Sequence, residues 1–274
     1  MKIKQGILYI ATGQRFRGEA ISSARRVQEL MPETPLALAS DLLLEGKLFS
    51  YTIPIERPQG SFADKIAPLS QTPFQESLFL DTDTYLCEPV PEIFEILQHY
   101  DIALAHAPMR QTGSVDVPAT FPEFNSGVIA YRMNERTRSL LENWGRFYEE
   151  QVARTGQIDD QPALRRALWH SDAKIAVLPP EYNFRFVLPA FAGRGKVKIL
   201  HGRHHNIPEL EKLINRSGSP RVFLPRLRDA LPRRFQFISG PGIVLGKLMM
   251  PMALLASFFG SAFDGLRNRI KKWK

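Results

Sequence analysis

The chain has 274 residues, of which 44% are hydrophobic and 10% aromatic. This composition excludes fibrous, disordered and disulfide-rich classes, and the length suffices for one large core with or without an appendage. The single cysteine, Cys87, cannot form an internal disulfide and indicates a reducing cytoplasm. The apolar run before Gln14 is too short for a secretory signal and is expected to be the first strand.

The net charge of +8 is distributed unevenly along the chain. Residues 1–202 contain 22 Lys and Arg against 24 Asp and Glu, whereas residues 203–274 contain 14 against 4. All the positive excess is therefore C-terminal. A basic segment of this kind indicates contact with an anionic surface, either nucleic acid or the cytoplasmic leaflet of a membrane.

The first 55 residues predict the strand, helix, strand order of an α/β domain with a parallel sheet. Strands are expected at 7–11, 36–39 and 51–55, and apolar residues spaced by three predict a helix at 20–31. Nucleotides bind such sheets at the carboxyl ends of the strands. The residues after the first strand are therefore candidates for a nucleotide pocket, with a plain turn as the simpler explanation. They are Thr12, Gly13 and Arg15.

The sequence SLFLDTDTYL at 77–86 carries the clearest chemical signal. Its apolar start predicts the end of a strand buried on both faces, and this strand runs directly into Asp81 and Asp83. A buried unpaired carboxylate costs several kcal/mol, so an acidic pair at this place usually has a cation beside it. Hard oxygen ligands suit Mn²⁺ or Mg²⁺, and these ions suit a diphosphate. The alternative is a strand-end turn, in which aspartate is common.

The middle of the chain continues the alternation of helices and strands. Helices are predicted at 61–69 and 91–99, and a strand at 101–105. Residues 108–122 contain three prolines and a glycine without periodicity. Long irregular loops in compact domains are usually functional or mobile, so this loop is a candidate for a functional role.

Polar side chains stand at the starts of two later elements. Asn125 and Ser126 open a predicted strand at 124–131, where they could meet sugar hydroxyls or form a structural turn. Asp159 and Asp160 precede another predicted helix. Helix capping, with Asp159 as a good N-cap, explains one of the two aspartates but not both.

Two further strands and a capped helix complete the predicted domain. Asn134 is expected to cap a long amphipathic helix whose apolar stripe packs in the core. Strands are predicted at 173–178 and 197–200, and the second ends at His201. A histidine at a strand end is more often a satisfied surface group than a metal ligand, unless another ligand lies near it.

Taken together, these motifs resemble the retaining glycosyltransferases of family eight, which have the GT-A fold and include glycogenin and bacterial lipopolysaccharide galactosyl- and glucosyltransferases. The match runs in the family's order over about residues 5–205, which is far more specific than any single motif. A lysine also stands 16 residues before the first motif aspartate, as in the family. The matching positions are Lys65, Asp81 to Asp83, Phe124 to Val128, Asp160-Gln161, Leu178 to Asn183 and His201.

The resemblance implies an α/β, GT-A (Rossmann-like) nucleotide-diphospho-sugar transferase fold with a mainly parallel mixed central sheet. This domain would occupy 1–206, and a basic, hydrophobic, helical tail that associates with membranes would occupy 207–274. The resemblance also implies a metal ion, Mn²⁺ or Mg²⁺, held by Asp81, Asp83 and His201.

The remaining roles implied by the resemblance concern the donor. Asp81 would contact the ribose as well as the metal, and Lys65 would face the sugar or the diphosphate. The residues expected around the donor and its sugar are Asn125, Ser126, Asp160 and Gln161.

One feature departs from the family pattern. The family histidine opens an H-x-x-G-x-x-K-P-W sequence whose glycine and lysine hold the diphosphate, but here His201 is followed by GRHHNIP. The phosphate lysine is therefore missing. Arg203, His204 or His205 could replace it, because each can donate to phosphate.

The tail has its own pattern. The uncharged run at 248–263 has 16 residues, about 24 Å as a helix, which is short of the roughly 30 Å hydrocarbon core. A monotopic or re-entrant helix at an anionic cytoplasmic leaflet is therefore predicted, with a helix packed on the domain as the alternative. Nucleic acid is not expected, because the basic residues interleave with Leu, Met and Phe.

The sequence thus predicts a cytoplasm-facing, peripheral or monotopic, metal-dependent glycosyltransferase. Its donor would be a nucleotide sugar, with UDP as the expected nucleotide, and its acceptor a glycan or lipid-linked saccharide. One alternative is a catalytically impaired, transferase-like membrane scaffold that lacks the phosphate-binding lysine. Another is a haloacid-dehalogenase-type phosphatase, which also uses D-x-D but requires Thr or Val where this chain has Tyr85.

Overall fold

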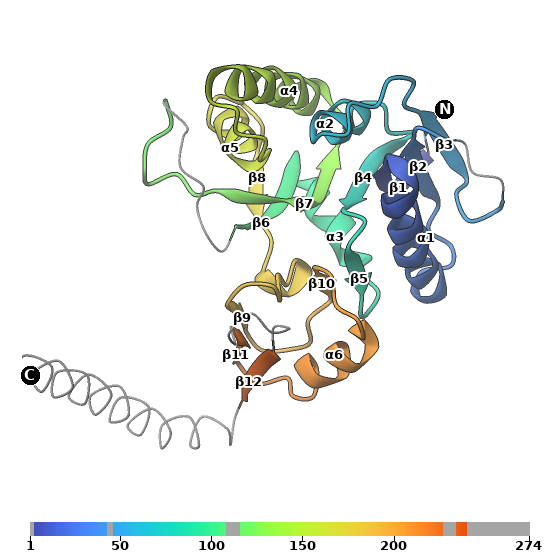
Figure 1. Cartoon of the computed structure of the whole chain (residues 1–274), viewed down its shortest axis with the longest axis vertical. Helices are drawn as coiled ribbons and strands as arrows, with labels where there is room; N and C mark the ends of the chain where they lie inside the picture. Colours follow the sequence, from blue (N-terminus) through green and yellow to red (C-terminus); the bar gives the residue numbers. More distant parts are fainter. Residues whose placement is uncertain (1–2, 43–45, 108–115, 227–233, 240–274) are drawn as a thin grey trace, which may run out of the picture.

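The structure is a computed structural model that describes residues 3–42, 46–107, 116–226 and 234–239. The strands of its main sheet are β1 (Ile3–Ala11), β2 (Leu36–Ser40), β3 (Tyr51–Pro54), β4 (Phe74–Leu80), β6 (Ile102–His106), β7 (Phe124–Arg132) and β8 (Ile175–Val177). Within the described residues they pair in the order β3-β2-β1-β4-β7-β6-β8 (Figure 1). Only β7 among them is antiparallel to its neighbours, so the prediction of a mixed, mainly parallel sheet is confirmed.

Helices cover both faces of this sheet. They are α1 (Gly13–Leu30), α2 (Ala63–Leu69), α3 (Glu92–Glu95), the short 3-10 helix η1 (Ile96–Gln98), α4 (Glu135–Thr155) and α5 (Gln161–Trp169). Successive strand residues point to opposite faces. On β1, Ile7 and Tyr9 therefore join the core under α1 and α3, whereas Leu8 and Ile10 join the core under α2, α4 and α5. The carboxyl ends of the parallel strands remain uncovered by these helices.

A smaller lobe lies beside those ends (Figure 1). Its elements are β5 (Thr84–Leu86), η2 (Pro180–Tyr182), β9 (Ala190–Ala192), β10 (Ile199–His201), α6 (Ile207–Ile214), β11 (Arg221–Arg226) and β12 (Arg234–Ser239). Their core contains Phe184, Phe186, Leu210, Ile214 and Phe223. Folded structure thus continues past residue 206, where the tail was predicted to begin. The apolar run at 248–263 lies outside the described residues.

The structure differs from the predicted elements at two helices. The first helix begins at Gly13, whereas the sequence predicted Ala20. The prediction missed the first two turns because they are largely exposed and carry no apolar periodicity. The predicted helix at 91–99 is one turn of α-helix, α3, followed by η1. Among the described residues, no helix is both long enough and apolar enough to cross a membrane.

Asp101 joins three elements at the edge of the sheet. Its buried carboxylate accepts hydrogen bonds from Asn134 Nδ2 at 2.6 Å and from the Lys174 amide at 2.8 Å. The Asn134 side chain in turn accepts from the Thr137 amide at 3.0 Å and caps α4, as predicted. One carboxylate therefore holds the start of β6, the start of α4 and the segment before β8 together.

Candidate functional site

Asp81, Asp83 and His201 come together where the main sheet meets the smaller lobe. The two aspartates lie in the turn between β4 and β5, and His201 ends β10. The antiparallel pairing of β5 with β10 places His201 opposite Thr84. His201 Nε2 lies 3.3 Å from Asp83 Oδ1 and 3.7 Å from Asp81 Oδ2.

This trio fits a divalent metal ion. Each of the three residues offers one ligand atom, and the three atoms lie within 4.8 Å of one another. Carboxylate oxygens and a neutral imidazole suit Mn²⁺. Gly127 on β7 lies beside them, and a Cβ there would approach Asp81 Oδ2 to 2.6 Å and collide with the His201 ring. Because Gly127 has no side chain, Asp81 and His201 can both pack against β7 at this point.

A chain of hydrogen bonds fixes which nitrogen of His201 carries the proton. The Gly127 amide can only donate, and it donates to Asn125 Oδ1 at 3.1 Å. Asn183 Nδ2 donates to the same oxygen at 2.8 Å, which leaves Asn183 Oδ1 as an acceptor for His201 Nδ1 at 2.8 Å. His201 Nδ1 therefore holds a hydrogen, and Nε2 accepts through its lone pair from Arg185 Nη1 at 3.0 Å, because a guanidinium group can only donate.

The same chain orients Gln161. Because Asn125 Oδ1 accepts from Gly127, Asn125 Nδ2 is the donor to Gln161 Oε1, at 2.7 Å. The amide oxygen of Gln161 is thus engaged, and its Nε2 donors are left for other partners. Asn125 and Gln161, predicted from separate motifs, form one hydrogen-bonded unit.

Lys65 connects the trio to the start of α5. Its Nζ lies 2.6 Å from Asp160 Oδ2 and 3.7 Å from Asp81 Oδ1, and it donates to Ser126 Oγ at 2.9 Å. Ser126 Oγ donates to Asp160 Oδ1 at 3.0 Å. The N-cap residue of α5 is Asp160, whereas the sequence predicted Asp159, and the Asp160 side chain makes no capping bond but faces Lys65. Asp159, one residue earlier, accepts from the Gln161 amide at 2.9 Å.

The pKa values reflect burial and these neighbours. Burial raises the pKa of Asp81, against the opposing positive charge of Lys65. Burial would also raise the pKa of Asp83, but the guanidinium groups of Arg203 and Arg185 lower it. For Lys65, burial is outweighed by Asp160 and Asp81, so its pKa is raised. Asp83 and Lys65 are therefore charged at neutral pH.

These residues line one cavity of about 620 Å³. Ten of the fourteen residues predicted from the sequence contribute to its wall: Thr12, Lys65, Asp81, Asp83, Asn125, Ser126, Asp160, Gln161, His201 and Arg203. Thr12 Oγ1 donates to Asp64 Oδ2 at 3.3 Å, and Arg203 Nη1 lies 3.2 Å from Asp83 Oδ2. The cavity therefore collects side chains from both lobes.

Four predicted residues are not part of this wall, as far as the described residues define it: Gly13, Arg15, His204 and His205. The Gly13 amide donates to the Asp41 carboxylate, and Arg15 pairs with Glu19 on the exposed side of α1. His204 Nδ1 lies 2.9 Å from the Asn206 carbonyl oxygen, outside the cavity. The turn after β1 directs Gly13 and Arg15 away from the cavity. Of the three residues predicted in this turn, only Thr12 faces the cavity.

Three of the wall residues that sequence reasoning missed have side chains suited to binding a ligand. Phe16 and Phe62 present rings that are 43% and 42% exposed at the cavity. Arg185, two residues after the tyrosine-asparagine pair of the L-P-x-x-Y-N motif, places Nη1 3.0 Å from His201 Nε2. Its place beside that motif was the one available signal, since neither periodicity nor spacing marks any of the three.

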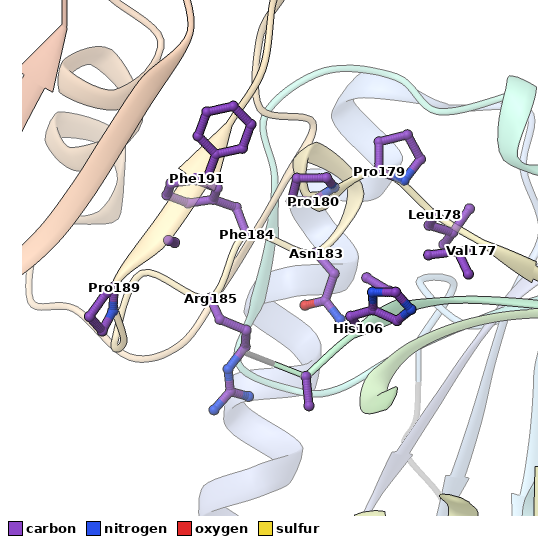
Figure 2. Close-up of a pocket in the computed structure, with 13 residues that line it drawn as sticks. His106, Val177, Leu178, Pro179, Pro180, Asn183, Phe184, Arg185, Pro189 and Phe191 are labelled. Atoms are coloured by element: carbon purple, nitrogen blue, oxygen red, sulfur yellow. The ribbon is translucent and has the colours of Figure 1, made fainter. Parts of the chain in front are cut away.

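A second cavity, of about 470 Å³, is lined by the residues drawn in Figure 2 and shares Arg185 with the first. Asn183, which bonds His201, also lines the second cavity. Proline, alanine and phenylalanine side chains form most of its wall, and Phe191 is 53% exposed at its edge. An apolar space thus opens next to the polar one.

Comparison with known proteins identifies the fold. No family model matches the sequence, and no curated protein matches it. Among solved structures, the galactosyltransferase LgtC in complex with donor and acceptor sugar analogues has a TM-score of 0.50 and 15% identity, over 73% of this chain and 87% of LgtC. The glycosyltransferase GlyE of Streptococcus pneumoniae TIGR4 has a TM-score of 0.52 and 15% identity, over 74% of this chain and 56% of GlyE. The chain therefore has the GT-A glycosyltransferase fold, which confirms the predicted resemblance at the level of the fold.

Proposed function

We propose that this chain is a metal-dependent glycosyltransferase that transfers a hexose, with retention, from a UDP-sugar to a glycan or lipid-linked acceptor. The proposal is carried by one observation: the trio Asp81, Asp83 and His201 shares a cavity with Lys65 and Asp160. The GT-A fold supports it, because the cavity lies at the carboxyl ends of the parallel strands, where such sheets bind nucleotides.

In this function, Asp81, Asp83 and His201 would hold Mn²⁺ or Mg²⁺. The bound ion would act as a Lewis acid for the negative charge that develops on the departing diphosphate. Lys65 adds a fixed positive charge 3.7 Å from Asp81 Oδ1. Arg203, which is held by Glu19 through two hydrogen bonds of 2.9 and 2.8 Å, adds another beside Asp83.

The sugar would lie against Asp160, Gln161 and Asn125. Gln161 has donors available because Asn125 engages its oxygen, so it is suited to bind sugar hydroxyls. The exposed ring of Phe16 offers an apolar surface on which a nucleobase can stack. The donor would therefore extend from Phe16 past the trio to the start of α5.

The adjoining cavity is the place that we propose for the acceptor. Sugar rings present apolar faces that pack on side chains such as Phe191 and the neighbouring prolines in Figure 2. A saccharide seated there would reach the donor cavity past Arg185 and Asn183.

We also propose that the chain works at the cytoplasmic face of a membrane, through its basic, apolar C-terminal segment. The support is the sequence alone: the uncharged run at 248–263 and the basic residues of RNRIKKWK at the end of the chain. Flotation with anionic and with neutral vesicles tests this proposal. Binding to neither kind of vesicle by the full chain would contradict it.

The function is tested by calorimetric titration with UDP, with and without Mn²⁺, on the native chain and on Asp83→Ala. We expect binding that requires both the metal and Asp83. Asp172→Ala, at an exposed aspartate outside the cavity, is the matched control and should bind as the native chain does. If UDP, GDP and other nucleotides all fail to bind in the presence of metal, the transferase proposal is wrong.

The two alternatives make different predictions in this experiment. A scaffold without catalytic capacity should bind no nucleotide, and the complete trio speaks against it. A phosphatase of the haloacid-dehalogenase type should release phosphate from simple phosphate esters. The position of the aspartates after β4, the central strand of the seven-stranded GT-A sheet and next to the antiparallel β7, does not favour that reaction class.

A further inference from the structure

Arg185 forms a hydrogen bond with Nε2 of His201, the atom that a metal ion would need as a ligand. Arg185 Nη1 lies 3.0 Å from His201 Nε2. A guanidinium group can only donate, so Nε2 accepts this hydrogen bond through its lone pair, while Nδ1 carries the hydrogen that faces Asn183. The other two groups that face Nε2 are the carboxylates of Asp81 and Asp83, which supply no proton when ionised.

One lone pair cannot serve two partners. A metal ion bound by the trio would take His201 Nε2 as a ligand, because Nδ1 is engaged with Asn183. Arg185 Nη1 must then leave His201. The backbone of Arg185 cannot move far, since the neighbouring Phe184 bonds β10 twice, through its amide to Ile199 at 2.9 Å and its carbonyl to His201 at 3.0 Å.

The displaced guanidinium would remain beside the metal ion. Arg185 is half-buried, and its Nε has no hydrogen-bond partner among the described residues. Figure 2 shows the side chain extending away from the Pro180 and Phe191 side of the adjoining cavity. A buried donor without a partner is costly, and a guanidinium fork matches the oxygens of a phosphate group.

We propose that Arg185 is a diphosphate-binding residue that exchanges partners: it bonds His201 in the metal-free protein and the diphosphate of the nucleotide once metal is bound. This inference rests on the proposed function, since it takes a nucleoside diphosphate as the ligand. It adds a coupling between the two ligands. Metal binding frees the cation that the diphosphate needs, so metal and nucleotide bind with positive cooperativity.

If Arg185 exchanges partners, replacing it should change the affinity for Mn²⁺ and the affinity for UDP in opposite directions. In Arg185→Ala, Mn²⁺ alone should bind more tightly than in the native chain, about 3- to 10-fold, because no guanidinium competes for His201 Nε2. UDP at saturating Mn²⁺ should bind more weakly, about 10- to 100-fold, because a charge-assisted bond to phosphate is lost. A substitution that merely damages the fold would weaken both.

The experiment measures free Mn²⁺ by electron paramagnetic resonance and UDP binding by calorimetry. Arg194→Ala, at an exposed arginine of the same segment, is the control and should change neither affinity. Arg185→Lys keeps the charge without the fork and should lie between the native chain and Arg185→Ala for UDP. If Arg185→Ala melts at a lower temperature than the native chain, Arg185→Lys decides the test.

The outcomes separate this inference from the proposed function. If the native chain binds neither Mn²⁺ nor UDP, the proposed function fails, and this inference falls with it. If the native chain binds both, while Arg185→Ala changes neither affinity or moves both in the same direction, the exchange of partners is refuted and the transferase proposal stands.

Discussion

Replacing Lys65 by methionine removes one member of a buried ion pair and leaves the other behind. Asp160 is only 3% exposed in its side chain, and its Oδ2 lies 2.6 Å from Lys65 Nζ. At an effective dielectric constant of about 20, the attraction across this distance is about 6 kcal/mol, most of which offsets the cost of burying both charges. Without Lys65 that cost remains for Asp160. We expect Lys65→Met to lower the free energy of unfolding by about 3–5 kcal/mol.

The double variant Lys65→Met/Asp160→Asn removes both charges and should recover most of the loss, to within about 1–2 kcal/mol of the native chain. Urea unfolding followed by tryptophan fluorescence measures both, and Trp144 is a local reporter because its Nε1 donates to the Asp160 carbonyl oxygen at 3.0 Å. If the single variant loses less than about 1 kcal/mol, or if the double variant is less stable than the single one, the argument about the buried charge is wrong.

Three further predictions follow from the structure. Gly127→Ala should abolish Mn²⁺ binding measured by calorimetry, because its methyl group would collide with two of the three ligands; unchanged affinity would contradict this site. Burial would raise the pKa of Asp101, but hydrogen bonds from the Lys174 amide and Asn134 lower it. The stability from Asp101 is therefore present above its unfolded pKa and lost as pH falls through the lower, folded value, so Asp101→Asn should flatten the acid limb of an unfolding curve and cost about 1–3 kcal/mol at pH 7. Phe16→Ala should weaken UDP binding by about 1–3 kcal/mol while leaving pyrophosphate binding unchanged; an equal loss for both ligands would exclude base stacking.

The sequence predicted most elements because the core strands are long apolar runs. Residues 78–80 and 128–131 lie on the central strands β4 and β7, and both are buried. The start of α1 was missed because exposed helical turns show no periodicity. Element type was thus predictable wherever packing determines the side chains.

Much of the cavity followed from motifs, because Asp81, Asn125 and Asp160 each stand at the start or end of an element. What sequence could not supply is the direction of side chains in turns. Thr12 faces the cavity, while Gly13, next to it, bonds Asp41. Arg185 reaches His201 because the backbone at Phe184 pairs with β10, a tertiary contact that no local pattern encodes.

The pairing of β5 with β10 has a consequence for how the protein is made. About 120 residues separate Asp83 from His201, so at translation rates of 5–20 residues per second the two aspartates precede the histidine by roughly 6–24 s. If the trio holds a metal ion, as proposed, the complete set of three ligands exists only after His201 has been synthesised. Metal binding by all three would then be a late step, because it must wait until β10 is available to pair with β5.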